Sequence, residues 1–75
     1  MIENADTTIY AYRVKKKLSQ RDLANLMDLP RTTVSFFENK KMFPDLETAE
    51  RMAKILDVTI GQLYSSKELA IILDN

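Results

Sequence analysis

Apolar residues recur every three or four positions along most of this chain, which is the period of an amphipathic helix. This spacing predicts helices over about 7–16, 19–28, 31–39, 45–56 and 59–64. Capping residues mark three of the starts. Ser19 with Asp22, and Thr59 with Gln62, have the spacing of a capping box, and Asp45 can cap the fourth helix alone. The pattern predicts an all-α fold with five helices.

The apolar tail, residues 69–73, fits either a helix or a strand. Together with the fifth helix it is more apolar than a monomer of this size needs outside its core, and an exposed apolar patch usually marks an interface. We therefore expect a two-fold dimer contact there. The alternative is a tail that folds back over its own core. The residues expected in the contact are Ile60, Leu63, Tyr64, Leu69, Ile72 and Leu73.

Composition narrows the classes of function. Seventy-five residues predict one domain over 1–75. The absence of Cys removes a thiol nucleophile and thiolate metal ligands, and the absence of His removes the commonest general base and the commonest metal ligand. We therefore expect neither an enzyme nor a metal or other cofactor. No apolar run is long enough to span a bilayer, and the N-terminal residues lack a signal-peptide pattern. The expected location is the cytoplasm, without a membrane partner or small-molecule ligand.

Charge is distributed unevenly although the net charge is zero. Residues 1–8 hold two acidic residues, a net charge of −2. Residues 9–44 hold eight basic and three acidic residues, a net charge of +5, whereas residues 45–75 hold three basic and six acidic residues, a net charge of −3. A basic half suits a polyanionic partner. Chance clustering on a solvated surface is the alternative.

Residues 19–38 contain two short helices separated by about three residues, a turn that projects the second helix outward. The side chains expected to pack the helices together are Leu23, Leu29, Val34 and Phe37. Those left on or near the outer face are Arg31, Thr32, Thr33, Ser35 and Phe36. A packed apolar seam beneath a small, polar and basic face is typical of a helix that enters a DNA major groove.

A longer register of residues supports this interpretation. It comprises Arg13, Leu18, Ser19, Gln20, Leu23, Ala24, the run Asp28-Leu29-Pro30-Arg31-Thr32-Thr33-Val34-Ser35, Glu38, Pro44, Leu46, Glu47, Thr48, Ala53, Lys54, Leu56, Asp57, Val58 and Leu63. Taken together, it resembles the lambda-repressor/Cro-type (XRE-like) helix-turn-helix family over roughly residues 9–64, without a gap.

The resemblance implies a five-helix lambda-repressor-like domain that binds operator DNA as a homodimer and regulates transcription. We favour a repressor over an activator. The alternative function is an antitoxin or protein-interaction module built on the same fold.

The resemblance also implies roles for individual residues. The base-reading positions are Arg31, Thr32, Ser35 and Phe36. The contacts to the DNA backbone are Gln20, Asn39, Lys40 and Lys41, to which we add Thr33. Arg13 and Glu38 match a structural ion pair. For Arg31 the alternative is a phosphate contact, and for Phe36 it is burial against Met42, Phe43 or a partner.

Departures from the family pattern occur at the helix ends. Lys17, Asp28, Lys40 and Asp57 stand where the family often has Gly, and a left-handed backbone there would strain a lysine by roughly 1 kcal/mol. We expect Asn39 to be able to take the positive φ in place of Lys40. Pro30 replaces the usual Ser or Thr cap of the third helix, so its start can differ by a residue.

Overall fold

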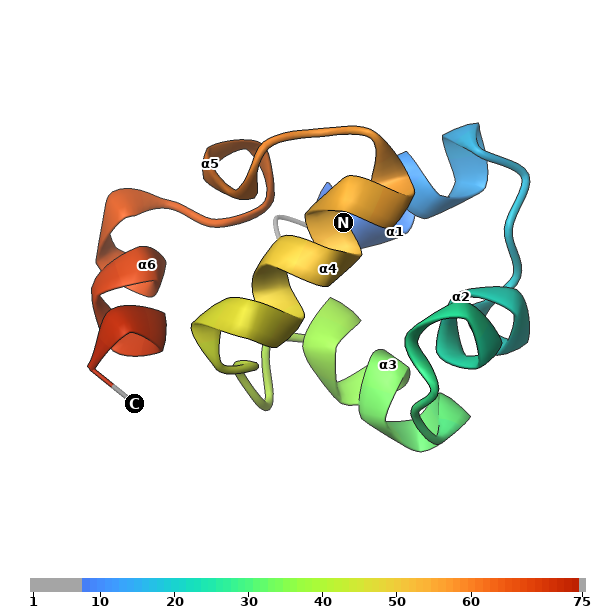
Figure 1. The fold of residues 1–75 in the computed structure, drawn as a ribbon, viewed down its shortest axis with the longest axis horizontal. Helices are drawn as coiled ribbons and strands as arrows, with labels where there is room; N and C mark the ends of the chain where they lie inside the picture. The colour runs from blue at the N-terminus through green and yellow to red at the C-terminus, as the bar shows by residue number, and fades with distance from the viewer. Residues whose placement is uncertain (1–7, 75) are drawn as a thin grey trace. The chain divides into compact units, whose positions relative to one another are not determined.

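The computed structural model describes residues 8–74, and this part of the chain is helical with no strand (Figure 1). The helices are α1 (Thr8–Lys15), α2 (Gln20–Met27), α3 (Arg31–Glu38), α4 (Leu46–Leu56), α5 (Ile60–Leu63) and α6 (Ser66–Leu73). The all-α prediction is confirmed over this range. The tail that fitted either helix or strand is the sixth helix. Residue 7, where the first helix was predicted to begin, lies outside the described residues.

The chain divides into two compact units, residues 1–42 and residues 43–75. In the first unit, α3 packs against both α2 and α1. Its buried apolar side chains are Ile9, Leu23, Ala24, Met27, Val34 and Phe37. Leu23, Val34 and Phe37 are therefore buried as the helical period predicts, and Leu29 in the intervening turn is half-buried.

The second unit contains α4, α5 and α6, and α4 packs against α5. Its buried apolar side chains are Ala49, Met52, Ala53, Leu56, Leu63, Tyr64 and Ile72. The rings of Phe43 and Tyr64 lie 5.9 Å apart and tilted, an arrangement that aromatic pairs favour. Burial raises the pKa of the Tyr64 phenol far above its ordinary value, and the negative charge of Glu68 adds to this effect. Its burial and its contact with Phe43 make Tyr64 a packing residue.

Side-chain caps start four of the helices. The predicted capping box at α2 is present, with the Asp22 amide donating to Ser19 Oγ and the Ser19 amide to Asp22 Oδ2, both at 2.9 Å. Hydrogen bonding from the Ser19 backbone amide, and to a smaller extent from the Ser19 side chain, lowers the pKa of the Asp22 carboxyl. Asp45 and Thr59 cap α4 and α5 as predicted. The equivalent box at α6, Ser65 with Glu68, was not predicted although it has the same spacing.

Four helices end in the left-handed region without a glycine. Lys17, Asp28, Lys40 and Asp57 have φ between 58° and 62°. Each lets the next amide reach back to a carbonyl five residues earlier, as Lys41 N does to Phe36 O at 3.0 Å. The expectation that Asn39 can replace Lys40 in this role is wrong, because Asn39 has φ −90° and its amide already closes the last turn of α3.

No helix among residues 8–74 is both long enough and apolar enough to cross a membrane.

Candidate nucleic-acid interface

A turn of three residues, 28–30, places α3 beside α2. Asp28 adopts the left-handed conformation, and the Leu29 amide bonds back to Ala24 O at 2.9 Å. Pro30 then sits at the cap of α3 and offers no side-chain bond, but its carbonyl accepts from the Thr33 amide at 3.0 Å. Pro30 therefore costs the helix no donor, and α3 begins at Arg31 as predicted.

The outward side of α3 carries the residues predicted to contact bases. Thr32, Ser35, Phe36 and Asn39 follow the i, i+3, i+4, i+7 spacing of a single helix face, and we call this set the outer stripe. Thr32, Phe36 and Asn39 are exposed and Ser35 is half-buried, whereas the inward residues Val34, Phe37 and Glu38 are buried. Arg31 is exposed and Thr33 half-buried beside the stripe. Phe36 is 44% exposed, so it is not sequestered in a core.

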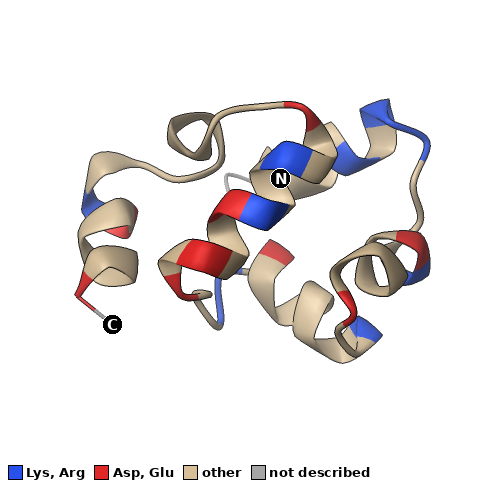
Figure 2. Cartoon of the chain, viewed as in Figure 1, with Lys and Arg blue, Asp and Glu red and all other residues tan. Residues whose placement is uncertain are grey.

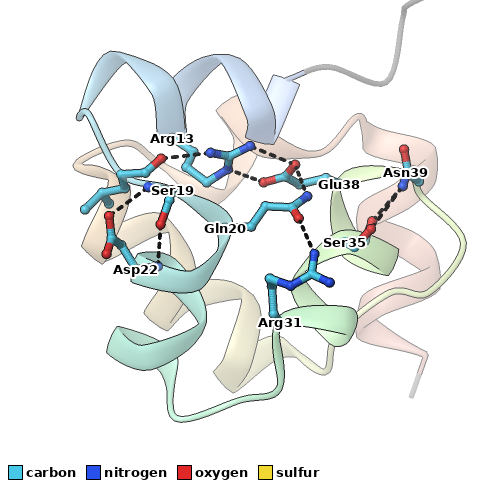
Figure 3. Close-up of polar contacts among 9 residues, drawn as sticks. Arg13, Ser19, Gln20, Asp22, Arg31, Ser35, Glu38 and Asn39 are labelled. Atoms are coloured by element: carbon cyan, nitrogen blue, oxygen red, sulfur yellow. Dashed lines mark hydrogen bonds and ion pairs between the residues drawn. The ribbon is translucent and has the colours of Figure 1, made fainter.

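Beneath the stripe, a buried ion pair joins α1 to α3 (Figure 3). Arg13 donates through Nε to Glu38 Oε2 and through Nη2 to Glu38 Oε1, the latter at 3.2 Å. Its Nη1 donates to the carbonyl of Leu18 at 2.8 Å, and the Tyr10 ring lies 5.1 Å from the guanidinium. Both partners are at least 93% buried, so each charge depends on the other for compensation. The structure thus contains the ion pair that the resemblance implied.

Gln20 extends this arrangement to the surface. Its Nε2 donates to Glu38 Oε1 at 3.0 Å, and its Oε1 accepts from Arg31 Nη1 at 3.1 Å. A continuous series of bonds therefore runs from the buried Glu38 carboxylate through Gln20 to the first residue of α3, as Figure 3 shows. Gln20 restrains Arg31. Its predicted phosphate contact stays a prediction, and it would use the second hydrogen of the amide nitrogen.

The far end of the stripe is held by a local pair. Asn39 Nδ2 donates to the Ser35 carbonyl at 3.0 Å and lies 3.4 Å from Ser35 Oγ (Figure 3). Ser35 and Asn39 were predicted to contact a base and a phosphate respectively, and both contacts stay predictions. In the present arrangement their polar groups engage one another.

Basic residues lie at the start of α3 and after its end, and the exposed Asp28 lies in the turn before it. Charges lie only at the two ends of this helix (Figure 2), and the acidic one, Glu38, is buried and paired. Lys40 and Lys41 follow the helix, Lys40 half-buried and Lys41 exposed. The described part of this unit, residues 8–42, holds eight basic and three acidic residues, a net charge of +5, and Glu3 and Asp6 bring the sequence of residues 1–42 to +3. Such a field attracts a polyanion.

Comparison with known proteins agrees with this geometry. The pattern of the helix-turn-helix family matches residues 9–63 of the chain. The chain belongs to this helix-turn-helix family. The family predicted from residues 9–64 is thus confirmed.

Two relatives of this helix-turn-helix protein are named regulators. It is 37% identical over 57 residues to the HTH-type transcriptional activator BcrR of Enterococcus faecalis, an alignment that covers 76% of this chain and 28% of BcrR. It is 36% identical over 56 residues to the cryptic phage CTXphi transcriptional repressor RstR of Vibrio cholerae, covering 75% of this chain and 50% of RstR. The aligned part of the chain therefore spans half or less of each of these relatives.

The residues predicted for a dimer contact divide into two groups in this helix-turn-helix protein. Leu63, Tyr64 and Ile72 are buried within the chain itself, so they cannot supply an exposed contact surface. Leu63 and Ile72 lie on the inward sides of α5 and α6, and Tyr64 directly follows α5 with its ring against Phe43. Ile60 and Leu69 are half-buried, and Leu73 is 63% exposed.

One exposed apolar residue of α6 was missed. Ile71 is 47% exposed and lines a shallow hollow with Ala70, Leu73 and Asp74. The run Ile71-Ile72 gave no signal of which side chain faces outward, because both are equally apolar. The dimer contact stays a prediction, now centred on Ile71 and Leu73.

Proposed function

We propose that this helix-turn-helix protein binds double-stranded DNA sequence-specifically and regulates transcription. The observation that carries the proposal is the outward-facing outer stripe of α3. It lies within residues 8–42, which carry a net charge of +5, while the one carboxylate of that helix is buried. A helix is the element that fits the major groove, and small polar, basic and apolar side chains are the groups that read base edges there.

Base reading begins at Arg31. Gln20 holds its guanidinium through one N–H, so the side chain has less freedom to lose on binding. A bidentate pair of its other donors suits guanine O6 and N7. Thr32, Ser35 and Phe36 face the following base pairs. Thr33, Asn39, Lys40 and Lys41 hold phosphates, which fix the register without reading sequence.

The proposed regulator acts as a two-fold dimer. The exposed apolar side chains of α6, Ile71 and Leu73, support this assembly together with the half-buried Ile60 and Leu69. A dimer places two copies of α3 about one DNA turn apart, roughly 34 Å.

Since one relative is named an activator and the other a repressor, both activation and repression occur among similar proteins. Repression needs only that the bound dimer occludes polymerase, and this is the outcome we propose.

Selection of bound duplexes from a random DNA pool tests this function. We expect a recovered motif with two-fold symmetry and half-site centres about 10 base pairs apart. Sedimentation of the protein at high micromolar concentration should then show a dimer. Recovery of no motif contradicts the proposed function, whereas an asymmetric motif with a monomer in sedimentation contradicts the dimer alone.

The same selection with Arg31→Ala tests the base contact. Without the bidentate contact, the selected motif should no longer prefer guanine at one position of each half-site. The preference for guanine over the other bases should fall by about 1–3 kcal/mol. Arg51→Ala is the matched control, because it removes the same charge from the exposed side of α4. If both variants recover the wild-type motif, Arg31 does not read a base.

A further inference from the structure

Phe36 is the exposed aromatic side chain of α3, and its surroundings specify what it can contact. It is 44% exposed, whereas the adjacent Phe37 is 3% exposed and belongs to the buried side of the helix. The two rings therefore have different roles despite being neighbours. Phe36 lies within the outer stripe, one helical turn after Thr32 and about one turn before Asn39.

The polar residues next to Phe36 on the outer stripe interact with each other locally. These residues are Ser35 and Asn39, which are bonded to each other. Thr32 contributes a methyl group as well as a hydroxyl. Between these polar residues the stripe presents the apolar ring of Phe36, with the methyl group of Thr32 one helical turn before it.

The charged residues around Phe36 indicate what kind of partner binds this surface. The exposed Arg31 lies at one end of α3 and the exposed Lys41 lies beyond the other, and α3 has no exposed carboxylate. An apolar protein surface would meet one ring flanked by cations, which is too small a patch for a stable protein interface. A polyanion with an isolated apolar group fits better. In the major groove of DNA that group is the C5-methyl of thymine.

We infer that Phe36 reads the C5-methyl group of a thymine within each half-site, so that the protein distinguishes thymine from the other pyrimidine by apolar contact rather than by a hydrogen bond. This inference rests on the proposed function and assigns a specificity-determining role within it. Arg31 contacts a base through its hydrogen-bond donors. Phe36, which lies further along α3, contacts a base through its apolar ring.

A uracil scan of the selected duplex tests the inference. Uracil has the same pairing and the same major-groove acceptor as thymine and lacks only the methyl group. Each thymine of one half-site is replaced in turn by deoxyuridine, and the affinity of each duplex is measured by fluorescence anisotropy. With the wild-type protein we expect an affinity loss of about fourfold for each methyl that Phe36 covers.

The Phe36→Ala variant then assigns the effect to its side chain. It should bind the thymine duplex more weakly than the wild type does, and it should bind the thymine and uracil duplexes equally. Leu26→Ala is the matched control. Leu26 is an exposed apolar residue, 54% exposed, that lies on α2 rather than on α3. This control should reproduce the wild-type uracil scan.

The outcomes separate the inference from the proposed function. Sequence-selective binding with no effect of uracil at any position overturns the inference and leaves the proposed function intact. A uracil effect that persists in Phe36→Ala also overturns it, because another side chain then contacts the methyl. Absence of any sequence-selective duplex binding overturns both. Capture of a protein through Phe36 without DNA binding does the same.

Discussion

We expect the affinity of this protein for its selected duplex to fall about a thousandfold when the salt concentration rises from about 50 to about 200 mM. Neutralising DNA phosphates releases condensed counterions, and this release is less favourable in concentrated salt. The estimate assumes a dimer that makes about six phosphate contacts. The measurement is a titration of the duplex at several salt concentrations, from which the slope of the logarithm of affinity is taken.

Charge variants identify the cations responsible for the slope. Lys41→Ala should reduce its magnitude by about one for each subunit, because Lys41 is exposed directly after α3. Lys54→Ala is the control, since Lys54 is an exposed lysine of α4 and its loss should leave the slope unchanged. A flat salt response of the wild-type protein would contradict the proposed phosphate contacts. Equal slopes for the wild type and both variants would show that Lys41 makes no phosphate contact.

The second large effect concerns stability. Glu38→Ala should lower the free energy of unfolding by about 3–5 kcal/mol, because it leaves the buried charge of Arg13 without its partner. Gln20 would lose its acceptor in the same variant. Since small domains are typically stable by about 5–15 kcal/mol, this loss is a large fraction of the total. Urea denaturation followed by circular dichroism gives the value.

Two further variants separate charge compensation from the loss of a side chain. Glu50→Ala removes an exposed carboxylate of α4 and should change stability by no more than about 0.5 kcal/mol. The double variant Arg13→Met with Glu38→Leu replaces the whole pair by apolar groups and should recover most of the stability. The explanation fails if Glu38→Ala is as stable as Glu50→Ala, or if the double variant is less stable than Glu38→Ala.

Helix starts were predictable because their causes are local. The bonds between Ser19 and Asp22 span three residues, so the spacing in the sequence was sufficient to place the start of α2. The same spacing between Ser65 and Glu68 starts α6, and only the uniformly apolar run after it obscured the signal. The left-handed helix ends were harder to assign. Asn tolerates positive φ better than Lys, yet Lys40 adopts it because α3 continues through Glu38 and Asn39 still closes its last turn.

The sequence predicted which residues of α3 face outward. It predicted less well which hydrogen bonds the side chains of the site make. The helical period places Val34 and Phe37 inward and Phe36 on the opposite side of α3. Whether another part of the chain covers Phe36 depends on tertiary packing, and the structure leaves it 44% exposed. The bonds of Gln20 to both Glu38 and Arg31 depend on how α2 and α3 pack, and no local pattern specifies them. For the same reason, the sequence could not show which apolar residues of the last two helices are buried.

The central claim is that the outward side of α3 contacts DNA, and chemical-shift mapping tests it most directly. An isotope-labelled sample is titrated with the selected duplex while the backbone amide signals are followed by NMR. The predicted result is that the largest shifts fall within residues 31–41, with smaller shifts in α6. Large shifts in residues 66–73 with unchanged signals over 31–38 would contradict the claim.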